Sequence, residues 1–171
     1  MAFKRKPVAD CAIRLLVLDV DGVLTDGRLH FGPRGETLKV FHVRDGYGMR
    51  RLIAAGVEIA VISGRRSAAV SARCRELGVT RVLQGARNKL AAFERLVQGA
   101  HVAARDCACV GDDVPDVALF GVVGLSFAVR DAPVAVRRAA HHVTVLPGGS
   151  GAVREVCDRL LAARTGSKSA P

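Results

Sequence analysis

The sequence predicts a protein of the α/β class with a parallel central sheet. Short apolar runs with the length of buried strands alternate along the chain with segments that have the length of helices. Strands separated by helices form βαβ units, in which the strands lie parallel. Acidic residues follow two of the apolar runs, at the strand ends where open α/β sheets bind their ligands.

A strand and a hairpin are predicted first. Residues 13–18 are apolar and end at Asp19 and Asp21, which belong to a residue type that is depleted in strands. Two short alternating runs, residues 28–31 and 37–41, flank a Gly/Pro turn. They predict a β-hairpin inserted after the first strand.

A helix and the second strand follow the hairpin. Asp45 is of the residue type that caps helix N-termini, and it predicts a helix that ends near Ala55. Residues 57–62 predict the second core strand, which ends at Ser63 and Gly64. The other expected helices are residues 67–77, 88–97, 114–120, 133–140 and 152–163, and the other expected strands are residues 79–83, 107–110, 125–129 and 142–145.

Length and composition fit one globular domain. The chain has 171 residues and is 50% hydrophobic, which is enough for one full core and excludes a disordered chain. We expect a single domain over residues 1–171, with tails at residues 1–11 and 164–171. No apolar run reaches the roughly 18 residues of a membrane span, and no apolar segment follows the basic start. These features predict a cytoplasmic protein without a membrane segment.

The formal net charge of +10 allows two interpretations. Basic patches attract nucleic acids, but the Arg residues are scattered here, and one Tyr and no Trp offer little surface for base stacking. We therefore favour a site for an anionic substrate and expect no nucleic-acid binding. A nucleic-acid binder would instead lose affinity steeply with salt.

The five cysteines suggest neither disulfides nor zinc. Their number is odd, and no two of them are spaced as C-x-x-C. We expect buried thiols in a reducing compartment. The cysteines are Cys11, Cys74, Cys107, Cys109 and Cys157.

Four groups of polar residues mark the expected carboxyl ends of successive strands. Parallel strands bring such residues together at one edge of the sheet. Carboxylate oxygens suit a hard cation such as Mg²⁺, and a cation and a lysine can neutralise a phosphoryl group while an aspartate attacks it. The pattern therefore indicates a phosphatase site, formed by Asp19 and Asp21, by Ser63, by Lys89, and by Asp112 and Asp113.

Each group taken singly has a plain structural interpretation. Asp19 and Asp21 could form a turn, Lys89 could be a solvated helix residue, and Asp112 could complement a helix dipole. The His141-His142 pair could ligate a metal, but adjacent strand residues point to opposite faces, so we expect a structural role. For the glycine-rich residues 148–151, we prefer a tight turn to a phosphate cradle.

These residues carry a resemblance to a known family. Asp19-Val20-Asp21-Gly22-Val23, Ser63, Lys89 and residues 111–116 resemble the four motifs of the haloacid dehalogenase (HAD) superfamily of phosphohydrolases. Further segments resemble the 3-deoxy-D-manno-octulosonate 8-phosphate phosphatases of lipopolysaccharide precursor synthesis. Phosphatases of nine-carbon sialic-type sugar acid phosphates share most of them. The segments are DVDGVLTDG (19–27), FHVRDGYGM (41–49), QGARNKL (84–90) and GGSGAVREVCD (148–158), together with residues 63–65, 72–74 and 111–116.

The resemblance covers residues 13–162 and implies a fold and an assembly. The fold would be the Rossmann-like, three-layer α/β/α HAD fold, without a cap domain. The protein would be a homotetramer in which a neighbouring subunit covers each active site. One departure is Val117, where the family often has Trp after the last aspartate of the fourth motif.

The resemblance also implies roles for the site residues. Asp19 would be the nucleophile that forms an aspartyl-phosphate, and Asp21 would protonate the leaving hydroxyl and then activate water. Ser63 would bind a phosphoryl oxygen, and Lys89 would hold the phosphoryl charge. Mg²⁺ would be held by Asp19, by the backbone carbonyl of Asp21 and by Asp112, supported by Asp113 and Asp116.

Substrate binding would involve the backbone turns and two arginines. Arginine side chains suit a carboxylate or a phosphate. The substrate-binding residues implied are Asp19, Asp21, Gly22, Ser63, Gly64, Arg65, Arg73 and Lys89. Two alternatives stay open: a nine-carbon sugar acid 9-phosphate as the substrate, and a catalytically silent regulatory module that keeps the fold.

Overall fold

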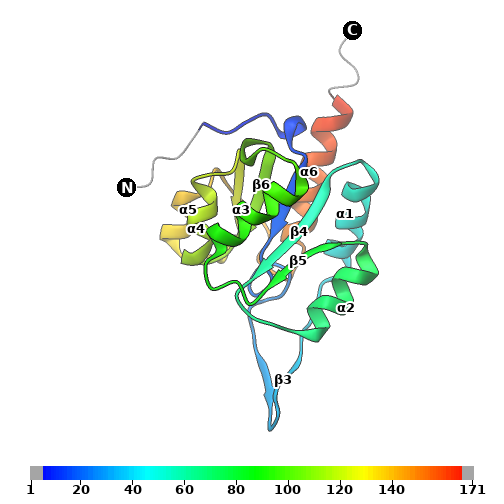
Figure 1. Ribbon diagram of the computed structural model, residues 1–171, viewed down its shortest axis with the longest axis vertical. Coiled ribbons are helices and arrows are strands. Elements are labelled where there is room, and N and C mark those ends of the chain that lie inside the picture. The colour runs from blue at the N-terminus through cyan, green and yellow to red at the C-terminus, as the bar shows by residue number, and fades with distance from the viewer. Residues whose placement is uncertain (1–5, 167–171) are drawn as a thin grey trace.

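The computed structural model describes residues 6–166, and the outer parts of the two expected tails lie outside these residues (Figure 1). Within the described part, a short 3-10 turn, η1 (Asp10–Ala12), precedes the first strand. Arg159 Nε donates to Asp10 Oδ2 at 2.6 Å, and Arg164 Nη1 donates to the Ile13 carbonyl at 2.7 Å. These contacts tie the two ends of the described chain together.

Six parallel strands form the central sheet, as the alternating pattern predicts. Their order is β5-β4-β1-β6-β7-β8, so the chain starts in the middle of the sheet and builds outward in both directions. The central strands β1, β4 and β6 are apolar and almost wholly buried, as expected for a parallel sheet covered on both faces. The strands are β1 (Leu15–Leu18), β4 (Glu58–Ser63), β5 (Arg81–Gln84), β6 (Cys107–Gly111), β7 (Leu125–Ala128) and β8 (His142–Val143).

Helices cover both faces of the sheet and complete the three layers. α1 packs against α2 and α6, while α4 packs against both α3 and α5. Right-handed crossovers explain this division, because the chain reverses its direction across the sheet after β5. The helices are α1 (Val43–Ala54), α2 (Ala68–Leu77), α3 (Lys89–Ala100), α4 (Val114–Phe120), α5 (Val134–Ala139) and α6 (Ala152–Gly166), with a 3-10 turn η2 (Ala104–Asp106).

The hairpin comes between β1 and α1 in the sequence, and it projects from the body of the molecule (Figure 1). Its strands β2 (His30–Gly32) and β3 (Gly35–Leu38) form a separate antiparallel sheet. They lie closer to the turn than expected because Gly32 pairs directly with Gly35. Two residues therefore make the turn, which is a common length for a hairpin loop.

The expectation that Asp45 caps its own helix is wrong. α1 begins at Val43, and the His42 side chain accepts the Arg44 N–H at its N-terminus. Asp45 is buried, and its Oδ1 accepts the Arg154 N–H at 2.7 Å in the first turn of α6. The carboxylate thus serves the N-terminus of a different helix, which sequence spacing does not reveal.

The expected burial of the cysteines is confirmed for four residues and is wrong for one. Cys74, Cys107, Cys109 and Cys157 are buried, whereas Cys11 is exposed. Burial raises the pKa of the Cys74 thiol to about 11 and that of Cys107 to about 12. These two thiols are therefore protonated near neutral pH and are poor nucleophiles.

The two adjacent histidines take different partners. His141 Nδ1 accepts the Ser126 N–H at 3.0 Å, while His142 lies 5.5 Å from the Phe127 ring. This separation agrees with structural roles rather than with a shared metal.

None of the helices in the described part of the chain has the length and apolarity needed to cross a membrane.

Candidate active site

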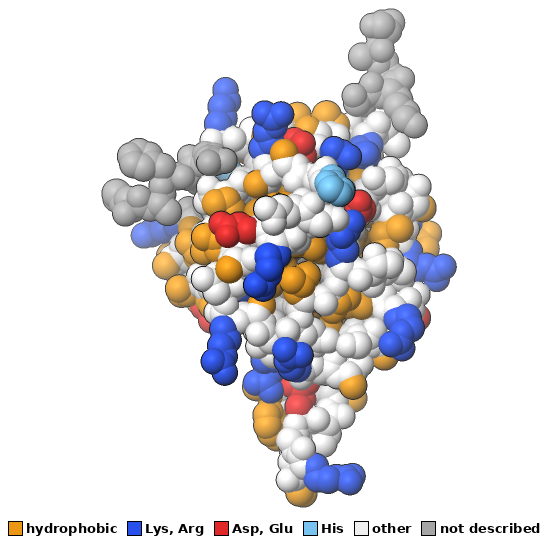
Figure 2. Space-filling model, viewed as in Figure 1, with side chains coloured by type: hydrophobic (Ala, Val, Ile, Leu, Met, Phe, Trp, Pro, Cys, Tyr) orange, Lys and Arg blue, Asp and Glu red, His pale blue; other side chains and the backbone are white. Residues whose placement is uncertain are grey.

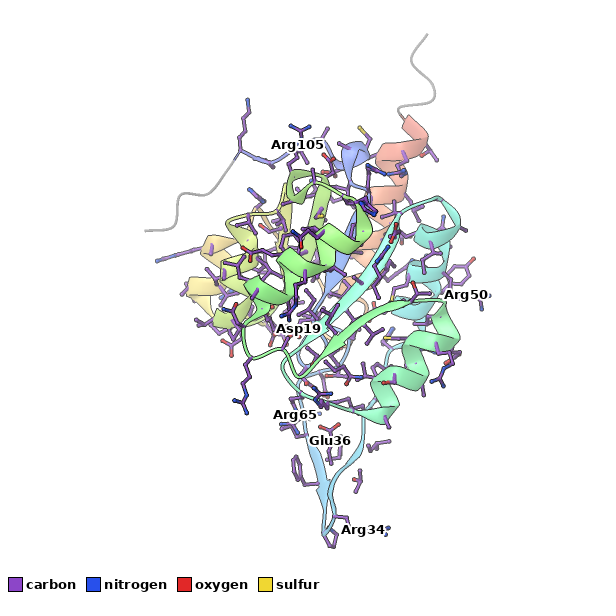
Figure 3. All side chains as sticks on the ribbon, in the orientation of Figure 1. Asp19, Arg34, Glu36, Arg50, Arg65 and Arg105 are labelled. Atoms are coloured by element: carbon purple, nitrogen blue, oxygen red, sulfur yellow. The ribbon has the colours of Figure 1, made fainter. Side chains whose placement is uncertain are left out.

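The motif residues meet at the carboxyl edge of the sheet. Asp19 follows the last residue of β1, and Ser63 ends β4. The register pairs Leu18 with Val61 and with Val110, so the ends of β1, β4 and β6 lie side by side. Figure 3 shows Asp19 at this edge, above Glu36 and Arg65.

Lys89 is the central cation of the site. It is the first residue of α3, and the side chain of Asn88 caps that helix by accepting the Ala91 N–H at 3.0 Å. Lys89 Nζ lies 2.9 Å from Asp19 Oδ1 and 2.7 Å from Asp116 Oδ1. Burial alone would lower the pKa of Lys89, but the two carboxylates outweigh it and raise the pKa. The lysine is therefore charged in the site.

Three carboxylates crowd around this lysine. One ligand atom from each of Asp19, Asp112 and Asp116 lies within 4.8 Å of the others. Burial, followed by repulsion from Asp116, raises the pKa of Asp19 to about 6. Burial, followed by repulsion from Asp19 and Asp116, raises the pKa of Asp112 to about 8. Such a set carries more negative charge than one lysine compensates, and it fits a divalent cation with oxygen ligands.

Asp116 is already committed to donors of the protein. Its Oδ1 accepts from Lys89, and its Oδ2 accepts the N–H groups of Asp112 at 3.2 Å and Asp113 at 3.4 Å. Asp113 caps α4, with its Oδ1 accepting the Val114 N–H at 2.7 Å. Asp116 therefore fixes the loop that carries Asp112.

The turn after β1 requires glycine. Gly22 has φ +90°, and a Cβ there would lie 2.1 Å from Asp112 Oδ2. The glycine-rich loop packs on this turn, since a Cβ on Gly148 would lie 1.7 Å from the Gly22 carbonyl oxygen. The Gly148 N–H donates to Asp131 Oδ1 at 3.0 Å, and the Gly149 N–H donates to the Val23 carbonyl at 2.9 Å. The loop is thus a packing turn rather than a phosphate cradle.

The structure brings Arg65 to the site but not Arg73. Ser63 is buried, and its Oγ accepts the Arg65 N–H at 3.2 Å across the exposed Gly64. Arg65 Nε lies 3.9 Å from Asp21 Oδ2. The Arg73 guanidinium lies instead against Gly46 of α1 and pairs with Glu76 at 2.9 Å.

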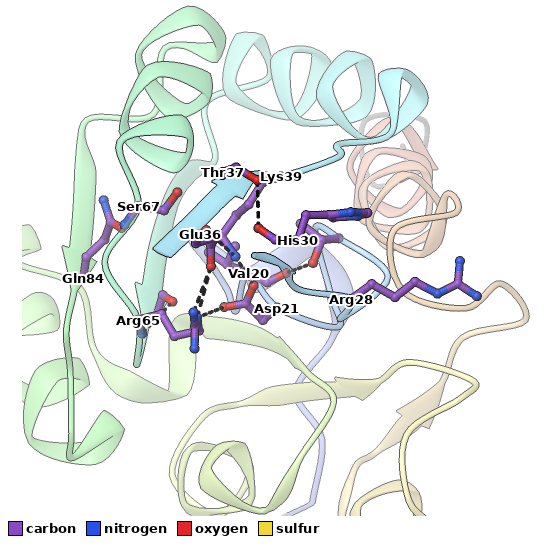
Figure 4. A network of polar contacts seen from close by, with 12 residues as sticks. Val20, Asp21, Arg28, His30, Glu36, Thr37, Lys39, Arg65, Ser67 and Gln84 are labelled. Carbon is purple, nitrogen blue, oxygen red and sulfur yellow. Dashed lines mark hydrogen bonds and ion pairs between the residues drawn. The ribbon is translucent and has the colours of Figure 1, made fainter. Parts of the chain in front are cut away.

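Two hairpin residues that sequence reasoning missed also reach the site. Lys39 Nζ contacts Asp21 Oδ1, and it lies 3.2 Å from Glu36 Oε1. Glu36 Oε2 accepts from Arg65 Nη2 at 3.0 Å, which closes a network around Asp21 (Figure 4). Alternation in the hairpin indicates that Lys39 faces away from Leu38 and Val40, but it does not indicate which face meets Asp21.

Two cavities on the surface differ in size and in whether motif residues line them. A cleft of about 220 Å³ opens beside Gly22, Asp112 and Asp113. A larger groove of about 800 Å³ runs past β5, and none of the described residues that line it belongs to the four motifs. Lys and Arg side chains are scattered over the face shown in Figure 2 rather than gathered in one patch. The smaller, acidic cleft thus lies beside motif residues, whereas the described lining of the larger groove includes none of them.

Fold and site together define a HAD-type phosphohydrolase. Asp19 and Asp21 follow β1, Ser63 ends β4, and the buried Lys89 begins α3. The acidic loop of Asp112 and Asp113 follows β6. The family described as haloacid dehalogenase-like hydrolase matches residues 79–151.

Curated relatives narrow this class. The 3-deoxy-D-manno-octulosonate 8-phosphate phosphatase KdsC of Escherichia coli K12 is 50% identical over 152 residues, which are 89% of this chain and 81% of the relative. The KdsC of Yersinia pestis is 45% identical over 164 residues, covering 92% of this chain and 88% of the relative. The chain therefore belongs to the family of 3-deoxy-D-manno-octulosonate 8-phosphate phosphatases, and it is a phosphoric monoester hydrolase.

Solved structures agree with this assignment and confirm the expected fold. The cobalt-bound phosphatase of Haemophilus influenzae has a TM-score of 0.91 at 42% identity, covering 94% of both chains. The Moraxella catarrhalis phosphatase, in complex with magnesium, phosphate and KDO, has a TM-score of 0.89 at 35% identity, covering 94% of this chain and 92% of that one.

Proposed function

We propose that this enzyme hydrolyses 3-deoxy-D-manno-octulosonate 8-phosphate to the free sugar acid and phosphate, in the synthesis of lipopolysaccharide precursors. The observation that carries the proposal is the contact of Asp19 with Lys89 at 2.9 Å, beside Asp112, in a chain 50% identical to a named KdsC. This edge supplies a nucleophile, a buried cation and an acidic metal site for a phosphate monoester.

We propose that the chemistry begins with attack by the Asp19 carboxylate on phosphorus. The bond from phosphorus to the sugar oxygen breaks, and Asp21 gives its proton to that oxygen. Asp21 then takes a proton from a water molecule as that water attacks the aspartyl-phosphate. The bond from phosphorus to Asp19 breaks, which releases phosphate and restores both carboxyl groups to their starting states.

The acidic set fits Mg²⁺, because close carboxylates raise the pKa values of Asp19 and Asp112. Asp19, the backbone carbonyl of Asp21 and Asp112 would hold the ion, with Asp113 and Asp116 as supports. When bound, the ion would neutralise charge on the phosphoryl group.

Substrate binding is proposed for the residues around the edge. Gly22, Ser63 and Gly64 would approach the phosphoryl group, and Arg65 would bind an anionic group of the substrate once released from Glu36. Arg73 pairs with Glu76 against α1, so it would have to leave these contacts to take part.

We further propose a cytoplasmic homotetramer in which the hairpin contributes to the interface. Its apolar residues are unusually exposed for their type. The exposed fraction is 45% for Leu29, 62% for Phe31, 53% for Leu38 and 57% for Val40. Exposed apolar groups that lie close together favour association. A neighbouring subunit on the hairpin would also cover the active site beside it.

Phosphate release in the presence of Mg²⁺ tests the substrate assignment. The substrates to compare are 3-deoxy-D-manno-octulosonate 8-phosphate, a nine-carbon sialic-type 9-phosphate and an aryl phosphate. We expect the highest kcat/KM for the eight-carbon substrate. Preference for the nine-carbon acid would keep the mechanism and overturn the substrate. No release from any of the three would favour a silent module.

A further inference from the structure

Lys39 is a buried cation that the hairpin delivers to the catalytic turn. Its side chain is only 2% exposed, and its Nζ contacts Asp21 Oδ1 and lies 3.2 Å from Glu36 Oε1 (Figure 4). Lysine is almost never this buried unless it is paired, because desolvation of its charge is costly. The contact with Asp21 therefore calls for an explanation in terms of function.

The hairpin's own stability does not supply one. Leu38 and Val40, on either side of Lys39, are 53% and 57% exposed, while the charged residue between them is buried. A hairpin selected for stability alone would bury the apolar pair and expose the lysine. The proposed interface would account for the exposed apolar pair but not for the buried lysine, whose Nζ contacts the carboxylate of Asp21.

Glu36 holds Lys39 from the side opposite Asp21. One Glu36 oxygen faces Lys39, and the other accepts from Arg65 Nη2 at 3.0 Å. Arg65 itself follows Ser63, which ends β4. Glu36 is thereby fixed from both the hairpin and the sheet, so the ammonium group of Lys39 has a defined place.

We propose that Lys39 is a positioning residue for proton transfer by Asp21. It holds Oδ1 of the carboxyl group, so that Oδ2, which lies 3.9 Å from Arg65 Nε, is the oxygen that carries the proton to the leaving group. A charge-assisted hydrogen bond is strong enough to restrict a short side chain, and proton transfer depends steeply on such orientation. The inference rests on the proposed role of Asp21 as the acid that protonates the leaving group.

The test compares leaving groups instead of one substrate. Lys39→Met removes the charge and keeps the length, Lys39→Arg restores a donor, and Arg34→Met changes an exposed cation at the tip of the same hairpin. The probes are aryl phosphates of graded leaving-group pKa and an alkyl phosphate, with kcat/KM measured for each. Poor leaving groups need the proton, whereas good leaving groups depart without it.

We expect Lys39→Met to lower kcat/KM about a hundredfold for the alkyl phosphate and less than about threefold for the most acidic phenol. Lys39→Arg should recover part of this loss, and Arg34→Met should behave like the unmodified enzyme. An equal loss for all leaving groups would overturn the proposal, since it would indicate a role in folding or in phosphate binding.

Two further variants keep the test decisive. Asp21→Asn should show the same leaving-group dependence, more strongly. If it does not, the proposed role of Asp21 fails, and that result is distinct from a failure at Lys39 alone. If Lys39→Met does not fold, Glu36→Gln is used in its place, because it weakens the hold on Lys39 and should give a smaller selective loss for poor leaving groups.

Discussion

The strand edge and the hairpin both contribute to one site, but by different means. At the edge, the register of β1, β4 and β6 fixes Asp19, Ser63 and the loop of Asp112 within the central sheet. Glu36 lies in a separate two-stranded sheet and Lys39 directly follows that sheet, and Lys39 forms ion pairs with both Asp21 and Glu36. The comparison indicates that the groups proposed to react lie at the edge of the core sheet, whereas the groups proposed to orient Asp21 lie on an insertion.

Among the changes at the strand edge, Asp19→Asn should have the largest effect. Loss of the nucleophile should lower kcat at least about a thousandfold. The folded state should be as stable or more stable in chelator at about pH 8, because the charged form of Asp19 is disfavoured there, as its raised pKa of about 6 indicates. Phosphate release and thermal melting measure the two effects.

Asp158→Asn is the matched control for this variant, because Asp158 is a carboxylate paired with Arg51 and Arg154 on the surface. It should change neither activity nor melting appreciably. Activity of Asp19→Asn close to that of this control would show that the edge does not carry the nucleophile.

Lys89→Met should affect both activity and stability. It leaves Asp19 and Asp116 buried without their cation, which should cost about 3 kcal/mol of unfolding free energy in chelator, beside a loss of turnover. Urea unfolding with and without Mg²⁺ measures the cost. Lys6→Met, at an exposed lysine, is the control. An equal change in unfolding free energy and turnover for both variants would contradict the role of Lys89 as the cation that pairs with Asp19 and Asp116.

The carboxylate cluster also predicts how pH and metal act together. The pKa values of Asp19 and Asp112, about 6 and about 8, are both above the ordinary value of 3.8. Groups with raised pKa values stabilise the folded state while protonated and lose this contribution as the pH rises through those values. In chelator, the melting temperature should therefore fall as the pH rises from about 4 to about 8, that is, from the ordinary pKa of these carboxyl groups to the raised pKa of Asp112.

Mg²⁺ should counteract this fall, because it binds the deprotonated carboxylates. The gain in melting temperature on adding Mg²⁺ should thus grow over the same pH range, and Asp112→Asn should reduce it. A gain that does not depend on pH would contradict a metal site made of these carboxylates.

The smallest expected effect on the single chain lies in the hairpin. Phe31→Ser removes an exposed ring, so the stability of the chain itself should change little. Its mass in solution should nevertheless shift toward smaller species if the hairpin forms the proposed interface. Light scattering after size-exclusion chromatography measures this shift, and an unchanged mass would argue against that interface.

The difference between the two regions also explains what the sequence could predict. Asp19, Ser63, Lys89 and Asp112 were expected together because parallel strands place their carboxyl ends at one edge. Confirmation of the fold supports that reasoning, while the roles of these residues remain predictions.

The features that the sequence did not predict all depend on how side chains are oriented in the folded molecule. Lys39 and Glu36 lie on a hairpin whose facing is set by the packed molecule, so alternation alone could not direct them to Asp21. Asp45 has the chemistry of a helix cap, but it serves α6 and not its own helix. Arg73 lies on a face of α2 that meets α1, which residue spacing along the chain does not reveal.

Trapping the phosphorylated enzyme tests the central claim most directly. The enzyme is mixed with a ³²P-labelled phosphate monoester and Mg²⁺, quenched in acid during turnover and digested for peptide mapping. We predict that the label is found on the peptide containing Asp19 and is absent from Asp19→Asn. Turnover without a labelled protein, or a label on another residue, would contradict the assignment of Asp19 as the nucleophile.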